Sequence, residues 1–244
     1  MKVVCIMQAR TGSTRLPGKV LKIICGKTVL EHDIDRLKRV KNIDEIIIAT
    51  TTHEKDDVIV EEANRLGVKH YRGSENDVLS RYYYAAKENV ADIIVRVTSD
   101  CPLIDSEVTE KIIQYYVDNK NKYDYVSNTI NRTYPRGLDT EAFSFNVLEK
   151  AFNEAVSSRD REHVTPYIWD NPTVFSLFQY KNDIDYSNLR WTLDTTEDYE
   201  LINRIYSSLY PLKGNEFNMN DIIELYNAFP VLREINKNIE QKKV

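Results

Sequence analysis

Apolar segments typical of strands alternate with amphipathic segments through the first half of this sequence. Apolar runs occur at residues 3–7, 45–50 and 92–97, and residues 68–71 form a further short strand-like segment. Helical spacing of apolar residues follows them at residues 29–40, 56–66, 78–89 and 108–119. Because parallel strands need crossover connections that pack on the sheet, this alternation predicts an α/β fold. The sheet is expected to be mostly parallel, with helices on both faces.

The segments that follow three of these strands contain the most unusual residues of the chain. They span residues 10–19, 50–57 and 98–105, and they are rich in glycine, hydroxyl and charged residues. In an open α/β sheet, ligands bind beyond the carboxyl ends of the strands. The three segments are therefore predicted to form one ligand-binding edge.

The second half of the sequence is less regular. It predicts helices over 143–156, 196–209 and 219–227, strands over 175–180 and 189–193, and a polar tail over 236–244 that frays. We expect a single domain over residues 1–244. Its parts are a nucleotide-binding half (about 1–122), an inserted acceptor or dimerisation lobe (about 123–185) and a return to the sheet (about 186–235).

Composition excludes several classes of protein. The net charge of −5 argues against general nucleic-acid binding, and no run approaches the roughly 20 apolar residues of a membrane helix. Cys5, Cys25 and Cys101 are far apart, without the spacing of a metal site, and are expected to be free thiols. These features predict a cytoplasmic protein with small-molecule ligands.

The segment that follows the first strand has the composition of a phosphate-binding loop. Arg10, Arg15 and Lys19 can neutralise a triphosphate, since arginine and lysine both pair well with phosphate oxygens. Backbone amides near Gly12 and Ser13 can approach an anion closely. The Walker spacing and the Gly-x-Gly-x-x-Gly pattern are both absent from the sequence.

Three sequence motifs carry a family resemblance. Residues 9–19 (Ala-Arg-Thr-Gly-Ser-Thr-Arg-Leu-Pro-Gly-Lys) resemble the signature of the sugar-acid cytidylyltransferases, which make CMP-ketodeoxyoctonate and CMP-sialic acid. Residues 99–104 (Ser-Asp-Cys-Pro-Leu-Ile) and 193–198 (Leu-Asp-Thr-Thr-Glu-Asp) resemble two further motifs of that family. Residues 72–81, 134–139 and 161–165 are similar to the spore coat polysaccharide biosynthesis protein F branch. Gln8 stands where the ketodeoxyoctonate and sialate enzymes usually have proline, which leaves the sugar open.

The resemblance implies a Rossmann-like nucleotidyltransferase fold and a magnesium-dependent transfer of CMP from CTP to a sugar or sugar acid, with release of pyrophosphate. It assigns the metal to Asp100 and Asp194. Both residues are predicted to end strands, and magnesium favours one or two carboxylates together with phosphate oxygens. The expected setting is surface polysaccharide or glycoconjugate biosynthesis by a homodimer.

The predicted site has four groups of residues. Nucleotide binding is expected from Gln8, Ala9, Arg10, Gly12, Ser13, Arg15, Lys19, Thr50, Arg72, Gly73, Ser74 and Arg81. The catalytic residues are expected to be Arg10, Arg15, Lys19 and Asp100, and the metal ligands Asp100 and Asp194. Acceptor binding is expected from Arg136, Asp139, Glu141 and His163, where Arg136 or His163 would hold a carboxylate.

Two other functions remain open from the sequence. A nucleotide-sugar glycosyltransferase usually carries an Asp-x-Asp metal motif, but residues 99–101 are Ser-Asp-Cys, with one aspartate. A non-catalytic nucleotide-sensing module would not need two aspartates together with three loop cations. Other nucleoside triphosphates remain alternatives to CTP.

Overall fold

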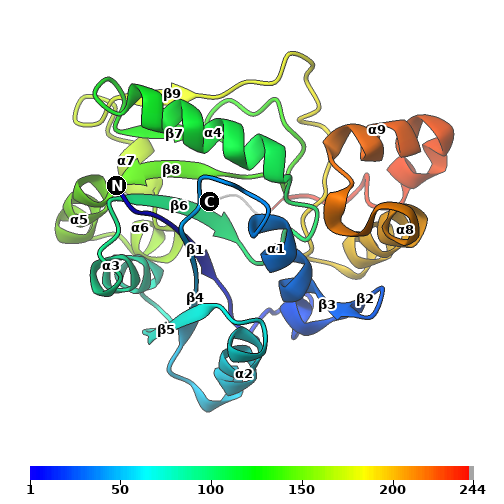
Figure 1. The fold of residues 1–244 in the computed structure, drawn as a ribbon, viewed down its shortest axis with the longest axis horizontal. Coiled ribbons are helices and arrows are strands. Elements are labelled where there is room, and N and C mark those ends of the chain that lie inside the picture. Colours follow the sequence, from blue (N-terminus) through cyan, green and yellow to red (C-terminus); the bar gives the residue numbers. More distant parts are fainter. Residues whose placement is uncertain (242–244) are drawn as a thin grey trace.

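The computed structural model describes residues 1–241 and contains a seven-stranded mixed sheet (Figure 1). The strand order is β5-β4-β1-β6-β8-β7-β9. These strands are β1 (Val3–Gln8), β4 (Glu45–Thr51), β5 (Lys69–Gly73), β6 (Ile93–Thr98), β7 (Tyr125–Ser127), β8 (Glu141–Ser144) and β9 (Leu177–Gln179). A separate short hairpin joins β2 (Ile23–Ile24) to β3 (Lys27–Thr28).

The pairing confirms the predicted mostly parallel sheet. β1 pairs in parallel with β4 and β6, and β4 pairs in parallel with β5. β8 is antiparallel to both β6 and β7, whereas β9 is parallel to β7. The segment expected to be an inserted lobe (123–185) therefore contributes three strands to the same sheet.

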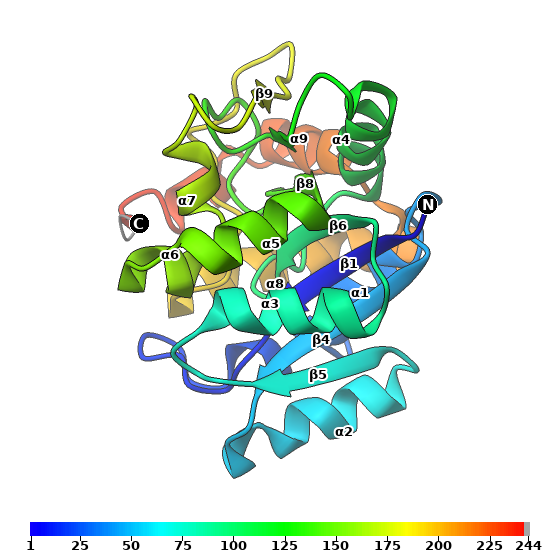
Figure 2. The same cartoon turned by 90° about the vertical axis from the view of Figure 1, so that its left-hand side faces the viewer.

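Alternating side chains of the strands build two apolar cores. In β1, Cys5 and Met7 belong to one core and Val4 and Ile6 to the other, as the two-residue period of a strand requires. The first core includes residues of α1 (Val29–Leu37), α2 (Asp57–Arg65), α4 (Ser106–Asn119), α8 (Thr196–Lys213) and α9 (Met219–Ala228). The opposite face is covered by α3 (Val78–Glu88), α5 (Phe145–Glu154), α6 (Ser158–His163) and α7 (Pro166–Trp169), and Figure 2 shows α3, α5 and α6 in front of the sheet.

Polar side chains fix where several helices begin. The Asp77 and Asp105 carboxylates accept backbone hydrogen bonds at the start of α3 and α4, and Ser144 does the same for α5. These caps satisfy amides that have no partner within the helix. The predicted helix over 143–156 thus begins only at Phe145, because Ser144 ends β8 and caps α5.

One other prediction was wrong. Residues 189–193 form no strand and contribute only an isolated bridge between Arg136 and Arg190. Their backbone bonds to neighbouring loops instead, for example from Trp191 N to Arg136 O and from Leu193 N to Asp100 O. In the tail that was expected to fray, Asn236 is buried, and residues 242–244 lie outside the described part of the chain.

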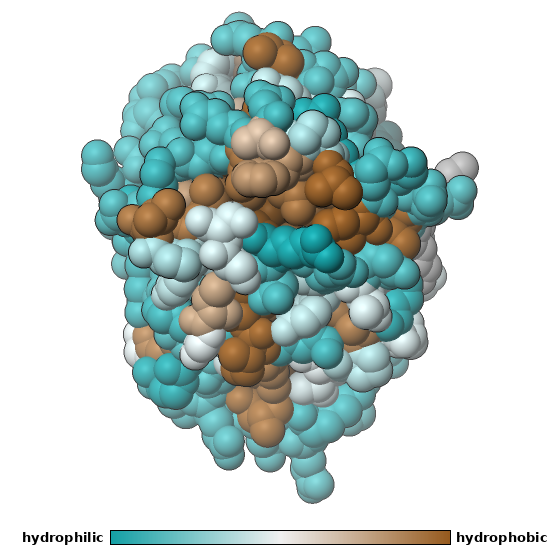
Figure 3. All heavy atoms as spheres, turned by 90° about the vertical axis from the view of Figure 1, so that its right-hand side faces the viewer, coloured by the Kyte–Doolittle hydropathy of each residue, from teal (hydrophilic) through white to brown (hydrophobic). Residues whose placement is uncertain are grey.

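The face that carries α8 and α9 is partly apolar. Figure 3 shows apolar side chains across the middle of this face, and the exposed ones on or beside its elements are Ile23, Leu212, Phe229 and Val231. Four short 3₁₀ helices complete the described elements: η1 (Lys19–Leu21), η2 (Glu54–Asp56), η3 (Gly214–Glu216) and η4 (Pro230–Glu234). Within residues 1–241, no helix combines the length and apolar character required to cross a membrane.

Candidate active site

The polar residues predicted to bind ligand gather at the carboxyl edge of the parallel strands. β1, β4 and β6 run in register and end at Gln8, Thr51 and Thr98, so the segments that follow them meet at one edge. A cavity of about 780 Å³ lies at the opposite edge, where Met1, Asp92 and Ile93 are among its lining residues. We place the site at the carboxyl edge, because the charged loops and the topology converge there.

A buried carboxylate anchors the first loop. Asp56 Oδ1 accepts hydrogen bonds from Thr11 N at 2.8 Å and from Thr11 Oγ1 at 2.7 Å, and its other oxygen accepts from Thr51 Oγ1. Burial opposes ionisation of Asp56, but the hydrogen bonds from Thr11 and Thr51 hold its pKa below the usual range. Within the loop, Ser13 Oγ accepts from Leu16 N at 3.3 Å. The loop is therefore ordered by hydrogen bonds to Asp56 and within itself.

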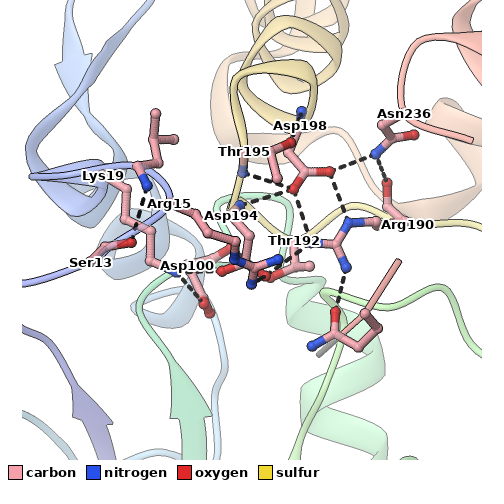
Figure 4. A network of polar contacts seen from close by, with 12 residues as sticks. Ser13, Arg15, Lys19, Asp100, Arg190, Thr192, Asp194, Thr195, Asp198 and Asn236 are labelled. Atoms are coloured by element: carbon pink, nitrogen blue, oxygen red, sulfur yellow. Dashed lines mark hydrogen bonds and ion pairs between the residues drawn. The ribbon is translucent and has the colours of Figure 1, made fainter. Parts of the chain in front are cut away.

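Lys19 joins the two predicted metal ligands. Its Nζ lies 2.7 Å from Asp100 Oδ2 and 2.8 Å from Asp194 Oδ1, although the aspartates are far apart in sequence (Figure 4). Burial disfavours the ammonium charge, but the two carboxylates raise the pKa of Lys19 to about 12. Burial would also raise the pKa of Asp100, and the attraction of Lys19 keeps it lowered. Lys19 and Asp100 are therefore both charged at neutral pH.

Asp194 has two further cationic neighbours. Its Oδ2 lies 2.9 Å from Arg15 Nη2 and 2.9 Å from Arg190 Nη2. Arg15 belongs to the first loop, with its side chain 39% exposed, whereas the Arg190 side chain is only 9% exposed. The predicted residues Arg15, Lys19, Asp100 and Asp194 thus form one contiguous cluster.

The same cluster fits a hard divalent cation. The carboxylates of Asp100 and Asp194 already share one cation, the Lys19 ammonium, so both can serve a single positive centre. Among residues 1–241 there is no grouping of three or more His, Cys, Asp or Glu side chains suited to a metal. A two-carboxylate site agrees with magnesium, which usually takes its remaining ligands from substrate phosphates and water.

A second charged cluster lies beside the first loop. Glu75 accepts from Arg10 Nη1 at 3.3 Å and from Lys55 Nζ at 3.3 Å, and its Oε2 lies 2.8 Å from His53 Nε2. A Cβ added at Gly12 would lie 3.2 Å from the Lys55 Nζ, which shows how closely this cluster approaches the loop backbone. Arg10 is therefore placed at the edge predicted for the nucleotide, with Glu75 as its present partner.

Other residues predicted to bind the nucleotide donate their hydrogen bonds to the backbone of loops and do not face open space. Arg81 is only 2% exposed and donates to Ser74 O at 2.7 Å. Gly73 leaves room for it, since a Cβ there would lie 2.9 Å from Arg81 Cγ. Arg72 donates to Thr51 O and His53 O, both at 2.9 Å. These residues therefore support the loops that border the site.

Thr50 and Ala9 are also enclosed by protein. Thr50 is fully buried in β4, which leaves its side chain no contact with a ligand at the edge. Ala9 is buried and donates to Ala49 O at 3.2 Å. Gln8 is half-buried, and its Oε1 accepts from Arg96 Nη2 at 3.4 Å. Gln8 alone of these three keeps a partly exposed side chain.

Arg136 is held next to the cluster around Asp194, because it forms a backbone bridge with Arg190. Its N–H donates to Leu189 O at 2.9 Å, and its carbonyl accepts from Trp191 N at 2.7 Å. Gly137 has φ +106°, and a Cβ there would lie 2.7 Å from the Trp191 carbonyl carbon, so this turn requires glycine. Burial and the charges of Arg132 and Arg190 lower the pKa of Arg136, which lies among other cations.

The remaining predicted acceptor residues already have partners. Asp139 accepts two hydrogen bonds from Arg132, one of them at 2.7 Å. Glu141, with its side chain 6% exposed, pairs with Arg96 and accepts from Tyr125 Oη at 2.6 Å. His163 lies at the end of α6 and also has a partner. The structure favours Arg136 as the available group of this set and gives Glu141 a buried structural position.

Sequence reasoning missed four residues that shape the site. Asp56 and Glu75 organise the first loop, and Arg190 and Asp198 surround Asp194. A signal existed for Asp198, since a Thr-x-x-Asp pattern predicts the capping box that it forms with Thr195. The other three act through contacts that no local pattern indicates.

The α/β sheet, the cationic first loop and the paired aspartates at its edge define a nucleotidyltransferase. A family model described as cytidylyltransferase matches residues 4–234, and the chain belongs to that family. It is thus a CTP-utilising nucleotidyltransferase, as the loop motif implied.

Similar proteins cover almost the whole chain. An uncharacterised protein, MJ1063 of Methanocaldococcus jannaschii, is 41% identical, covering 99% of this chain and 97% of that protein. The spore coat polysaccharide biosynthesis protein SpsF of Bacillus subtilis is 31% identical over 93% and 95%. The structure of a cytidylyltransferase from Leptospira borgpetersenii is 38% identical with a TM-score of 0.91, and both chains are fully covered. These matches confirm the predicted family branch.

More distant matches support the rest of the resemblance. The 3-deoxy-manno-octulosonate cytidylyltransferase of Bdellovibrio bacteriovorus is 33% identical over 49% of this chain and 47% of that protein. A Mycobacterium tuberculosis protein, Rv0371C, has the same fold at 14% identity (TM-score 0.57, 84% of this chain and 99% of that chain), and its structure is a manganese complex. Proteins of this fold thus include a divalent-metal complex.

Proposed function

We propose that this enzyme transfers CMP from CTP to a sugar or sugar acid, with magnesium as its metal, for surface polysaccharide or glycoconjugate biosynthesis. The proposal depends chiefly on one observation: Arg15, Lys19, Asp100 and Asp194 form a single cluster at the carboxyl edge of the sheet. The names of the Bacillus and Bdellovibrio relatives supply the polysaccharide context and the sugar-acid class.

In the proposed reaction an acceptor hydroxyl oxygen attacks the α-phosphorus of CTP, and the bond to pyrophosphate breaks. Arg10, Arg15 and Lys19 bind the phosphates and stabilise the charge of the leaving pyrophosphate. Magnesium held by Asp100 and Asp194 would neutralise charge on the phosphate oxygens. Phosphoryl transfer depends mainly on positioning and charge stabilisation, so the chain needs no covalent nucleophile.

The acceptor is proposed to lie against Arg136. This guanidinium is half-buried beside Arg190, which itself contacts the metal ligand Asp194. An arginine can bind a carboxylate through two parallel hydrogen bonds. The position therefore supports an acidic sugar next to the reacting phosphate.

The experiment is an assay of pyrophosphate release with CTP, magnesium and a panel of acidic and neutral sugars. We expect release only when CTP, metal and an acidic acceptor are all present. Transfer from a nucleotide sugar without consumption of CTP would instead support a glycosyltransferase. Binding of CTP without turnover on any acceptor would support a nucleotide-sensing module.

Two finer expectations belong to the same proposal. CTP should raise the melting temperature more than ATP, GTP or UTP, because a ligand that binds only the native state stabilises it by mass action. Equal shifts for the four triphosphates would contradict the choice of cytosine. We also propose a cytoplasmic homodimer, which sedimentation equilibrium of the purified protein would test.

A further inference from the structure

Arg190 is a buried residue that forms ion pairs with two carboxylates at once. Its Nη2 lies 2.9 Å from Asp194 Oδ2 and 2.9 Å from Asp198 Oδ2, and its Nε lies 2.9 Å from Asp198 Oδ1. A forked contact of this kind fixes orientation as well as charge. Arg190 therefore ties the predicted metal ligand Asp194 to the fully buried Asp198.

Asp198 in turn holds the backbone next to that ligand. Its Oδ2 accepts from Asp194 N at 3.0 Å and from Thr195 N at 3.1 Å. Thr195 and Asp198 also form the capping box that starts α8. The side chain of Asp194 is thus held by Arg190, while its backbone is held by the partner of Arg190.

The carboxyl-terminal segment closes this network. Asn236, which is 6% exposed, donates from Nδ2 to Asp198 Oδ1 at 2.9 Å and to Arg190 O at 3.0 Å (Figure 4). Farther along, Gln241 Oε1 accepts from Arg190 Nη1. Two side chains from the end of the chain therefore contact the arginine that contacts Asp194.

The contacts of Asp194 fall into two kinds. Arg15 and Lys19 come from the first loop, and in the proposed function these two residues bind the triphosphate. Arg190 comes from outside that loop and is fixed by Asp198 and Asn236. It is the partner of Asp194 that has no proposed contact with the nucleotide.

We propose that Arg190, fixed by Asn236, is the positioning residue that keeps Asp194 oriented toward the metal when Arg15 and Lys19 engage the triphosphate. The inference rests on the proposed function, because it assumes that Asp194 is a metal ligand. Groups that orient a metal ligand commonly change metal affinity by about 10- to 100-fold when they are removed. The carboxyl-terminal segment accordingly sets the metal affinity of a site to which it contributes no ligand.

The test uses the full chain with Asn236→Ala, which removes both hydrogen bonds that Asn236 Nδ2 donates to the network. Pyrophosphate release is measured against manganese and magnesium concentration, and manganese binding in the presence of CTP alone is measured by electron paramagnetic resonance. We expect the metal requirement to rise about tenfold, with kcat at saturating metal within about twofold of wild type. Manganese affinity in the absence of acceptor should fall by a similar factor.

Tyr226→Phe is the matched control. Tyr226 is buried in α9 and accepts from Trp191 Nε1 at 3.0 Å, so its loss also removes a buried hydrogen bond near the end of the chain. It should lower the melting temperature without changing the metal requirement. If both variants shift the metal requirement equally, or if Asn236→Ala shifts only the melting temperature, the positioning role is wrong.

Gln241→Ala is the milder second variant, and it decides the question if Asn236→Ala does not fold. A smaller rise in the metal requirement supports the proposal, whereas wild-type metal dependence contradicts it. Failure of the proposed function is distinguishable, because wild-type protein would then release no pyrophosphate in a metal-dependent manner. A wild type that is active and metal-dependent, together with unaltered variants, overturns only the inference about Arg190.

Discussion

The two sides of the site differ in how their charges are balanced. The carboxylates of Asp100 and Asp194 lie among Lys19, Arg15 and Arg190, with four ion pairs between 2.7 and 2.9 Å. Arg136 lies beside Arg190 through a backbone bridge, and within residues 1–241 its guanidinium has no hydrogen bond or ion pair.

This difference indicates two kinds of binding. The side with Asp100 and Asp194 is already ordered by its own charges, so in the proposed function a metal and a triphosphate would exchange partners with residues that are in place. The Arg136 guanidinium, by contrast, has no direct ion-pair partner among residues 1–241, which favours an anion supplied from outside. Mutations on the first side should affect chemistry, and mutations of Arg136 should affect acceptor binding.

The largest effect is expected from Asp100→Asn and Asp194→Asn. Each variant should abolish magnesium-dependent pyrophosphate release, a loss of several kcal/mol of transition-state stabilisation, because an amide is a poor ligand for a hard dication. The double variant should be little worse than either single one if both side chains hold one metal. Turnover and melting temperature should be measured together for all three variants.

The control for these variants is Asp118→Asn, which changes an exposed carboxylate on α4. It should retain wild-type turnover. Folded Asp100 or Asp194 variants with normal turnover would remove the metal assignment. A lower melting temperature with a proportionate loss of all binding would instead indicate a structural role for the two carboxylates.

Arg15→Ala should have the next largest effect. Loss of a phosphate contact would cost about 2–4 kcal/mol of transition-state stabilisation, a decrease in kcat/KM of roughly 30- to 1000-fold. Asp194 keeps Lys19 and Arg190 as partners, so the fold should be retained. Steady-state kinetics with CTP would check this, with Arg39→Ala as a control arginine on the surface. Wild-type turnover in Arg15→Ala would make Arg15 a surface cation only.

Arg136→Ala tests the uncompensated side of the site. It should raise KM for an acidic acceptor by roughly 10- to 100-fold, since a hydrogen bond to a charged group contributes about 1.5–3 kcal/mol. KM for CTP should stay within twofold. Arg136→Lys should be intermediate, because an ammonium cannot form the paired contact of a guanidinium. An equal rise in both KM values would place Arg136 at the nucleotide instead.

The fold was predictable where the hydrophobic period is long and regular. The strands around Cys5, Ile47 and Val95 and the helices between them were found because their apolar faces must be buried. β7 and β8 were missed because three- and four-residue strands carry almost no periodic signal. The apolar run 189–193 was wrongly predicted as a strand, since its backbone bonds are made with two distant loops.

The candidate site was predictable where topology alone brings residues together. Lys19 and Asp100 follow parallel strands, and these end at one edge. The contacts of Asp56, Glu75 and Asn236 span 45, 65 and 46 residues of sequence, and each depends on where two loops happen to meet. Such contacts follow from packing and have no local signature.

A third carboxyl group, that of Asp33, can be compared with those of Asp100 and Asp194. Asp33, in α1, is buried, and neither of its side-chain oxygens has a hydrogen-bond partner within the described residues. Burial, with a further contribution from Asp100, raises its pKa well above the usual value, although Arg36 and Lys19 act in the opposite direction. Ionising Asp33 in the folded state is therefore unfavourable, because no hydrogen-bonded cation offsets the loss of solvent.

Asp33→Asn should stabilise the metal-free protein at pH 8 by about 1–2 kcal/mol, the smallest effect predicted. Above an unfolded pKa of about 3.9, the unfolded chain releases the proton of Asp33 while the folded chain retains it. Wild-type stability therefore falls as pH rises from that value toward the raised folded pKa, whereas the amide variant lacks this loss. The variant's advantage in urea unfolding should be larger at pH 8 than at pH 5. Asp118→Asn, which changes an exposed carboxylate, is the control, and an Asp33→Asn variant less stable than wild type at pH 8 would contradict this account of Asp33.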